Sequence, residues 1–269
     1  MKILNTFFNK LIFDKNFIYK KINFFEANFL TKKEKIFLQY QFLNNQKIID
    51  FFINFKNNTI TLLNQKDFDN FDFHKLSLKE QKNILTQIAA IIKKYQSIKK
   101  KQDNESLFDE WNDDFILENI VFDQKWIQEM KETFLLVRKS VLKKKKNVLS
   151  HCDLHINNFL INNKKKVILI DFDTCHWSFK LFDLASFIEE TKLNLWQINY
   201  FCDLFSVKKK TIIGQVVLYH SLFWFFWSYY YYQKTFNLKF FDLCLYHLQN
   251  YCYFKLIFPF SSWKSSSRK

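Results

Sequence analysis

Glycine and proline are almost absent from this sequence of 269 residues, which contains one of each. A Walker-type phosphate loop and the dinucleotide-binding pattern G-x-G-x-x-G both need at least two glycines, so neither can be present. Collagen-like repeats and Gly/Ser linkers are excluded for the same reason. Apolar residues make up 48% of the chain, which predicts a packed core and argues against disorder.

Arginine is also scarce and occurs at positions 138 and 268, although 41 basic residues face 26 acidic ones and the net charge is +15. The basic residues are mostly lysines in short separated runs, such as Lys99–Lys101 and Lys143–Lys146, and they form no single stripe. Interfaces that read nucleic-acid bases favour the bidentate fork of arginine. We therefore expect a solvated lysine surface and no nucleic-acid partner.

The five cysteines are odd in number and form no C-x-x-C pair. This argues against a disulfide framework or a zinc knuckle and favours a reducing compartment. The first residues contain no long apolar run of the kind that a signal peptide needs. A cytoplasmic location is the expectation.

The segment Thr211–Gln233 lacks Lys, Arg, Asp and Glu and is long enough to cross a bilayer. It contains His220 and four consecutive tyrosines, Tyr229–Tyr232. Because tyrosines prefer membrane interfaces to the hydrocarbon centre, we interpret the segment as a buried core helix and not as a membrane span.

The secondary-structure pattern changes near residue 65. Before it, one hairpin is expected over Leu11–Phe13 and Phe17–Ile22, a helix over Thr31–Leu43, and a second hairpin over Ile48–Phe55 and Thr59–Leu63. This predicts a small α+β lobe over residues 1–65 and a mostly helical domain over residues 66–269. In the second domain we expect helices from Ser77, over Phe115–Ile120, over Lys125–Leu142 and from Leu184 onward, a polar loop from Val148, and short strands at Phe159–Ile161 and Val167–Ile170.

The segment His151–Asp183 is the part that suggests chemistry. Asp153 and Asn158 stand in the spacing H-x-D-x-x-x-x-N, and Asp171 follows an apolar strand. We expect all three at one end of the strand hairpin. Phosphoryl transfer needs a carboxylate to accept the proton of the attacking hydroxyl, which suits Asp153. It also needs oxygen ligands for Mg²⁺, which suits Asn158 and Asp171. Singly, such residues more often cap turns; their joint spacing favours the catalytic reading.

This segment resembles the catalytic region of the aminoglycoside phosphotransferase and choline kinase superfamily. The motif continues with Ile170–Asp173 and Asp183–Ala185. The resemblance implies a two-lobed protein-kinase-like fold, ATP and Mg²⁺ as cofactors, and a small hydroxylated substrate. It implies Asp153 as base, Asn158 and Asp171 as metal and nucleotide ligands, Asp153 and Asp173 as substrate-binding residues, and His151 and Asp183 as structural support for the catalytic loop.

A second match points to one branch of that superfamily. Leu222–Ser228 is similar to a helical segment F-L-W-x-L-W-S of choline and ethanolamine kinases. The resemblance implies that Trp224 and Trp227, with Trp177, form an aromatic box around a quaternary ammonium, which has no N–H donor and binds aromatic faces. In a chain with 20% aromatic residues, the alternative is that these tryptophans belong to the core.

The first 65 residues match the superfamily more loosely. The resemblance implies a strand lysine that holds the ATP phosphates, with a helix glutamate as its partner. Lys20 and Glu34 are the candidates, and Lys21 is an alternative to Lys20. The phosphate-covering loop corresponds to Asn5–Asn9, which has no glycine, and Asn9 is a candidate ligand because asparagine tolerates the left-handed backbone. Leu62–Gln65 corresponds to the hinge that receives adenine.

Three functions remain open from the sequence. The first is a kinase of choline or a related amino-alcohol, the second is a thiamine, aminoglycoside or sugar kinase of the same fold, and the third is an inactive kinase-like binding protein. An aminoglycoside would call for a carboxylate-rich wall, for which the acidic cluster Asp109, Glu110, Asp113 and Asp114 is a candidate. A solvated helix start is the other reading of that cluster. The oligomeric state cannot be derived.

Overall fold

The computed structural model describes residues 2–5, 9–13, 18–22, 29–48, 51–54, 59–62, 68–102, 104–110, 113–121, 124–143, 146–208 and 210–259. The chain divides into two compact units whose segments interleave along the sequence. Unit 1 comprises Met1–Ser77, Lys101–Asp109 and Asn157–Asp173. Unit 2 comprises Leu78–Lys100, Glu110–Ile156 and Thr174–Lys269. The division into lobes at residue 65 stays a prediction.

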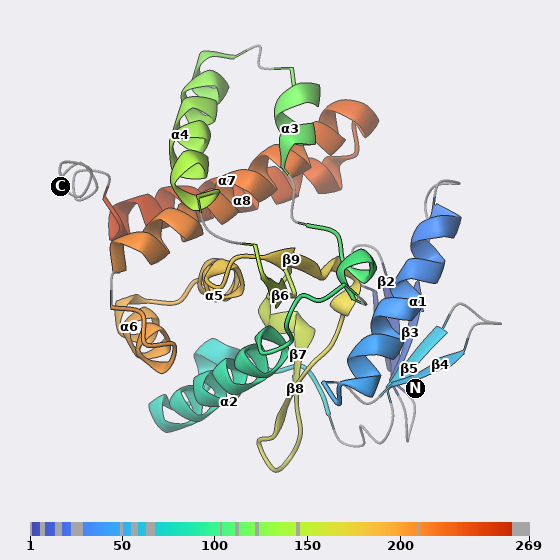
Figure 1. Cartoon of the computed structure of the whole chain (residues 1–269). Helices are drawn as coiled ribbons and strands as arrows, with labels where there is room; N and C mark the ends of the chain where they lie inside the picture. The colour runs from blue at the N-terminus through green and yellow to red at the C-terminus, as the bar shows by residue number, and fades with distance from the viewer. Residues whose placement is uncertain are drawn as a thin grey trace. The chain divides into compact units, whose positions relative to one another are not determined.

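Unit 1 is built on an antiparallel five-stranded sheet with the order β1-β2-β3-β5-β4. The strands are β1 (Lys2–Asn5), β2 (Asn9–Phe13), β3 (Ile18–Ile22), β4 (Phe51–Asn54) and β5 (Thr59–Leu62). The expected hairpins are the pairs β2–β3 and β4–β5, while β1 was not anticipated. Helix α1 (Phe29–Asn45) lies against the β4 end of the sheet (Figure 1).

A second small sheet in unit 1 is the hairpin of β7 (Phe159–Ile161) and β8 (Val167–Leu169). Both strands were expected, because each is a short apolar run and a polar turn joins them. The turn is closed by the Asn162 side chain, whose Oδ1 accepts the backbone N–H groups of Lys164 and Lys166. The hairpin is tied to the preceding chain by two backbone hydrogen bonds between Asp69 and Ile161, each 2.9 Å long.

Unit 2 is mainly helical and also holds a small two-stranded sheet. Its helices are α2 (Leu78–Gln96), α3 (Asp114–Asn119), α4 (Lys125–Val141), α5 (Phe182–Glu190), α6 (Leu195–Leu204), α7 (Lys210–Thr235) and α8 (Leu238–Ile257). Short 3-10 helices, across both units, span Phe73–Lys75, Glu105–Leu107, Ile156–Asn158 and Phe172–Thr174. An α+β fold is therefore confirmed.

One sequence expectation was wrong. Val148–Ser150 does not begin a polar loop but forms β6, which pairs antiparallel with β9 (His176–Ser178). Leu149 lies opposite Trp177, and both side chains are fully buried. The strand exists because of a partner that lies far away in the sequence, and no local pattern reveals such a partner.

Helix α7 is the centre of unit 2. It contacts α3, α4, α5 and α8, and α7 and α8 run side by side (Figure 1). Consecutive side chains of α7 are buried, for example those of Val216–Ser221. This is expected for a helix that other elements cover on several sides. The reading of Thr211–Gln233 as a core helix is thus confirmed. Among the described residues, no helix has the length and apolar character needed to cross a membrane.

The single glycine lies on α7 and has a packing role. A Cβ atom added at Gly214 would approach the Cγ and Cβ atoms of Phe258, at the end of α8, to 2.7 and 2.8 Å. Real Cβ contacts are longer, so the absence of a side chain at Gly214 allows Phe258 to pack against the α7 backbone. The scarce residue is used for close helix packing.

Candidate active site

Asp183, in the first turn of α5, binds the backbone of the loop that follows β6. The Asp183 carboxylate accepts the backbone N–H groups of His151 and Cys152, each at 3.0 Å, and the hydroxyl of Tyr95 at 2.7 Å. Asp183 is fully buried. Burial raises the pKa of Asp183, and the three hydrogen bonds act in the opposite direction. Asp183 therefore fixes the backbone that leads into Asp153.

Cys152 in this loop has a left-handed backbone, with φ at +67°. The left-handed region is costly for a residue with a Cβ atom, and it persists where surrounding contacts enforce it. Three hydrogen bonds enforce it here. The Cys152 N–H donates to Asp183, and the Thr174 hydroxyl donates to the His151 carbonyl at 2.7 Å. The Leu154 N–H donates to the Ser186 hydroxyl at 3.0 Å. Strain at Cys152 is thus offset by a set of short hydrogen bonds.

Asp153 follows this fixed backbone and keeps part of its carboxylate accessible. Its side chain is 32% exposed, and the nearest ring nitrogen of His155 lies 3.7 Å from its Oδ2. A general base needs an oxygen that a substrate hydroxyl can approach. Asp153 meets this condition, whereas His151 is completely buried and does not.

Asn158 and Asp171 lie at one end of the β7–β8 hairpin, in unit 1. Asn158 precedes β7, Asp171 follows β8, and the Asn158 carbonyl accepts the Ile170 N–H at 2.9 Å. Asn158 is buried and Asp171 is half-buried. An amide oxygen and a carboxylate are hard donors of the type that Mg²⁺ prefers, so this pair fits such an ion chemically. Asp153 belongs to unit 2.

The segment after Asp171 is bound to helix α1. The Tyr40 hydroxyl donates to Asp173 Oδ1 at 2.7 Å and accepts the Phe172 N–H at 2.9 Å. Tyr40 is itself fully buried. Tyr40 lies within the helix that the sequence predicted over Thr31–Leu43, and its contact with this segment was not anticipated. Asp173, expected to bind substrate, has one oxygen engaged by this tyrosine.

Of the nucleotide-binding residues expected in the first 65 positions, Lys20 and Glu34 lie on the strand and the helix that the sequence predicted, whereas Asn9 was expected in a loop and lies on a strand. Asn9 begins β2, Lys20 is on β3 opposite Leu11, and Glu34 is on α1. Their side chains lie outside the described part of the structure, as do residues 6–8 of the Asn5–Asn9 loop and residues 63–65 of the hinge. The assignment of phosphate contacts to these residues stays a prediction.

The three tryptophans of the expected aromatic box are not equivalent. Trp224 and Trp227 are half-buried on α7 and meet edge to face, with ring centres 5.2 Å apart and planes at 71°. Trp177 is completely buried on β9. A wall of a binding site needs a face that the ligand can reach, and this structure provides none at Trp177. We therefore leave Trp177 out of the pocket proposed below.

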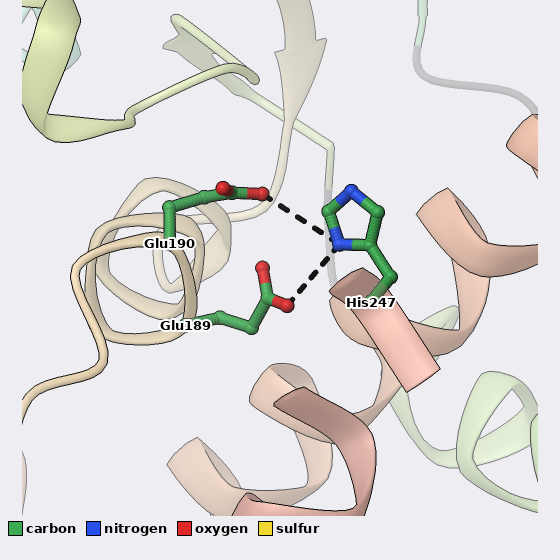
Figure 2. Close-up of side chains that lie close together, drawn as sticks. All are labelled: Glu189, Glu190 and His247. Atoms are coloured by element: carbon green, nitrogen blue, oxygen red, sulfur yellow. Dashed lines mark hydrogen bonds and ion pairs between the residues drawn. The ribbon is translucent and has the colours of Figure 1, made fainter. Parts of the chain in front are cut away.

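Next to Trp224 lies a polar network, buried except for the half-buried Glu190, that we name the Glu189 network. It comprises Glu189 and Glu190 at the end of α5, His220 on α7, and His247 and Asn250 on α8. Glu189 Oε2 lies 3.1 Å from His220 Nδ1, and Glu189 Oε1 lies 3.2 Å from His247 Nδ1. The Asn250 amide donates to the same Oε1 at 2.7 Å. Both carboxylates point at the same ring nitrogen of His247, at 3.8 Å from Glu190 (Figure 2).

The pKa values of the two neighbouring carboxyl groups in the Glu189 network shift in opposite directions. Burial raises the pKa of Glu189, but the electrostatic interaction with His247 and the hydrogen bonds with His220 and His247 outweigh burial and hold the pKa well below its usual value. Burial and the adjacent Glu189 charge together raise the pKa of Glu190 well above its usual value. Glu189 is thus the carboxylate of the pair, and Glu190 favours its neutral form.

Glu189, Glu190 and His247 also offer ligand atoms within 4.8 Å of one another, a spacing that could hold a metal ion. Hydrogen bonds already occupy both oxygens of Glu189, so the present arrangement is a closed network rather than an open ligand set. Sequence reasoning missed these three residues. The one local signal was a pair of acids, Glu189–Glu190, at the end of an otherwise apolar helical segment.

A model of the phosphotransferase enzyme family matches residues 59–204, which is more than half of the chain and includes the whole H-x-D-x-x-x-x-N segment. The chain therefore belongs to the phosphotransferase enzyme family, which is named APH. No curated protein matches this sequence.

Solved kinases have the same fold. The choline kinase LicA from Streptococcus pneumoniae is 14% identical, with a TM-score of 0.69 and coverage of 94% of each chain. A choline/ethanolamine kinase family protein from Mesorhizobium loti is 12% identical, with a TM-score of 0.72 and coverage of 96% of this chain and 87% of the other. The ADP-bound aminoglycoside phosphotransferase APH(2″)-Ib is 16% identical, with a TM-score of 0.65 and coverage of 93% of each chain. The expected kinase-like α+β fold is confirmed.

Proposed function

We propose that this phosphotransferase is an ATP- and Mg²⁺-dependent kinase that phosphorylates the hydroxyl group of choline or a related amino-alcohol. Membership of the family supports the reaction class. The adenine nucleotide is supported by two structural neighbours, LicA in complex with AMP and the ADP-bound aminoglycoside phosphotransferase. The acceptor is argued from residues of this chain.

In the proposed reaction, the acceptor oxygen attacks the γ-phosphorus of ATP, the bond between that phosphorus and the β,γ-bridging oxygen breaks, and ADP leaves. Asp153 accepts the proton of the attacking hydroxyl. Its accessible carboxylate and its fixed backbone suit this role, because proton transfer requires a base held within hydrogen-bonding reach. Asn158 and Asp171 would hold Mg²⁺, which supplies charge neutralisation at the phosphate oxygens.

The observation that favours an amino-alcohol is the combination of an aromatic pair with a buried acidic network. The half-buried rings of Trp224 and Trp227 meet edge to face. The His247 ring lies nearly parallel to that of Trp224, with centres 6.3 Å apart, and His247 contacts both carboxyl groups of the Glu189 network. Aromatic faces attract a cation by about 0.5–2 kcal/mol each, and a nearby carboxylate adds to this attraction. A ligand with a single ammonium group suits this arrangement.

The acidic cluster that could have formed an aminoglycoside wall is neutralised by basic partners. Asp109 pairs with Lys35 and Glu110 with Lys100, each at 2.7 Å, and Arg138 binds Asp113 and Asp114. Four carboxylates that already have basic partners offer less to a ligand with several ammonium groups. This favours the amino-alcohol over the aminoglycoside. Thiamine, which also carries a single positive charge, remains the second candidate acceptor.

The decisive experiment is an assay of purified protein with Mg²⁺ and ATP in which ADP release is compared for choline, ethanolamine, thiamine and kanamycin. We expect the highest kcat/KM with choline or ethanolamine. A preference for thiamine or kanamycin would replace the acceptor and retain the reaction. An absence of ADP release with all four would favour the inactive binding protein.

The aromatic pair is tested by Trp224→Ala and Trp227→Ala. Each change should raise the KM for the amino-alcohol about 3- to 30-fold, which corresponds to the loss of one cation–π contact, and leave the KM for ATP unchanged. Trp196→Ala on helix α6 is the matched control, because it removes a half-buried tryptophan of the same unit. Equal effects on the KM for the amino-alcohol and the KM for ATP would mean that Trp224 and Trp227 serve core packing and not acceptor binding.

A further inference from the structure

We propose that Glu189, acting through His220, is a positioning residue that fixes the orientation of the Trp224 indole in the acceptor pocket. This inference rests on the proposed function for its consequence in binding. The hydrogen-bonded chain itself can be tested without any activity. All of its members belong to unit 2.

The direction of the chain follows from elementary donor and acceptor chemistry. The indole Nε1–H of Trp224 can donate but cannot accept, and it lies 3.0 Å from His220 Nε2. His220 Nε2 must therefore accept and carries no proton in this arrangement. The ring proton is on Nδ1, which faces Glu189 Oε2 at 3.1 Å. The chain thus runs from Trp224 to His220 to Glu189, and His220 contributes to it as a neutral imidazole.

Packing leaves Glu189 and His220, the two inner members of this chain, no alternative partners in water. Glu189 and His220 are completely buried, and the Phe182 ring meets the His220 ring edge to face at 5.5 Å. The other oxygen of Glu189 is held by His247 and Asn250 from α8. A buried donor or acceptor that loses its partner is costly, so each member restrains the next. One carboxylate therefore connects α5, α7 and α8 at the point where Trp224 projects.

Trp224 is restrained at two places. Its Nε1 edge is bound by His220, and its ring lies almost parallel to that of His247, at an angle of 20°. The attraction between a cation and an indole depends on which face the ring presents. A ring that is already fixed loses less side-chain entropy when the ligand binds. The expected consequence is a lower KM for a cationic acceptor, with no effect on the proton transfer at Asp153.

The kinetic test compares His220→Phe, which removes both hydrogen bonds, with His220→Gln, which retains a donor and an acceptor. We expect His220→Phe to raise the KM and the Kd for choline about 3- to 10-fold, with kcat changed less than twofold and the KM for ATP unchanged. His220→Gln should recover most of the affinity. In a Trp224→Phe background, His220→Phe should have no further effect on the KM for choline, because the hydrogen bond between Trp224 and His220 is already absent.

The structural test uses ¹⁵N NMR on the whole protein and requires no substrate. In the wild type, His220 should show a protonated Nδ1 and an unprotonated Nε2. The indole N–H signal of Trp224, assigned by its loss in Trp224→Phe, should be protected from exchange and should shift in His220→Phe. A protonated Nε2 in the wild type would overturn the proposal even if His220→Phe failed to fold.

The two proposals fail in different ways. If the NMR signals behave as expected but choline affinity does not respond to His220→Phe, the positioning role is wrong. If no acceptor is phosphorylated at all, the proposed function is wrong, and the positioning role is then decided by the NMR signals together with calorimetric binding of choline.

Discussion

Helix α5 carries two buried acids that hold two different regions of the molecule. At its start, Asp183 accepts hydrogen bonds from two backbone N–H groups of the loop that contains the proposed base Asp153, and from the hydroxyl of Tyr95. At its end, Glu189 accepts from His220, His247 and Asn250, side chains of two other helices. Burial raises the pKa of Asp183, whereas the histidine partners bring the pKa of Glu189 below its usual value.

Asp183 therefore supports a loop, whereas Glu189 connects three helices. The donors to Asp183 cannot change their protonation at neutral pH, so this contact is a constant of the fold. Two of the donors to Glu189 are imidazole rings, in which the donating nitrogen depends on the tautomer, so this contact can be changed without breaking the fold of the loop. We therefore expect changes at the catalytic loop to alter turnover, and changes in the Glu189 network to alter stability and acceptor affinity.

The largest effect is expected at the catalytic loop itself. Asp153→Asn should lower kcat by about 10²- to 10⁴-fold, because it removes the proposed general base. Stability should change little, because the side chain is 32% exposed. Asp203→Asn, at an exposed position on α6, is the matched control. Steady-state kinetics and thermal unfolding measure the two effects, and a wild-type kcat in Asp153→Asn would show that another residue is the base.

The Glu189 network should respond in stability. Glu189→Gln should lower the free energy of unfolding by about 3–5 kcal/mol at neutral pH, because an amide group would face three buried donors. The pKa of Glu189 is lowered in the folded protein, so its contribution is present above the carboxyl pKa of the unfolded chain and is lost as pH falls through the folded pKa. Urea unfolding over a pH series should show the difference from wild type shrinking in acid.

Glu190→Gln is the matched control for that experiment and should act in the opposite sense. The pKa of Glu190 is raised in the folded protein, so its ionisation destabilises the fold as pH rises through that value. The variant should equal or exceed wild-type stability at neutral pH and lose this advantage in acid. Parallel pH profiles for both variants would contradict the opposite roles of the two carboxyl groups.

Asp183→Asn should combine a stability loss with a loss of turnover. The amide oxygen can accept fewer hydrogen bonds than the carboxylate, and we expect a cost of about 2–3 kcal/mol. Because the backbone of His151 and Cys152 would shift, kcat should fall while the KM for the acceptor changes little. Tyr95→Phe, which removes only the hydroxyl donor, should have a smaller effect on both quantities. A change confined to the acceptor KM would place Asp183 with the Glu189 network.

The smallest effect is expected for Gly214→Ala. Alanine should gain up to about 1 kcal/mol in helix propensity, but overpacking against Phe258 should cost about 1–3 kcal/mol, so a net loss of about 1 kcal/mol is expected in chemical unfolding. The double variant Gly214→Ala, Phe258→Leu should regain stability, because the smaller side chain relieves the contact. If Gly214→Ala alone were more stable than wild type, Phe258 at the end of α8 would be able to move away from α7 without cost.

Local patterns predicted the parts of the fold that depend on neighbours in the sequence. The strands at Phe159–Ile161 and Val167–Ile170 and the core helix over Thr211–Gln233 were correct within a few residues, because alternation, turn residues and continuous apolar character are properties of a short segment. The strand Val148–Ser150 was missed and the burial of Trp177 was left open, because each depends on the other across a long separation.

The sequence by itself predicted the reaction class and the residues that would carry it. The spacing of Asp153, Asn158 and Asp171 along a loop and hairpin is a local property, and the family match supports the reaction class. Only the tertiary structure decided which aromatic residues are accessible and in which direction the pKa of each acid shifts. Glu189, His220 and His247 are separated along the chain, so their contacts arise only when α5, α7 and α8 pack, and burial then strengthens each hydrogen bond.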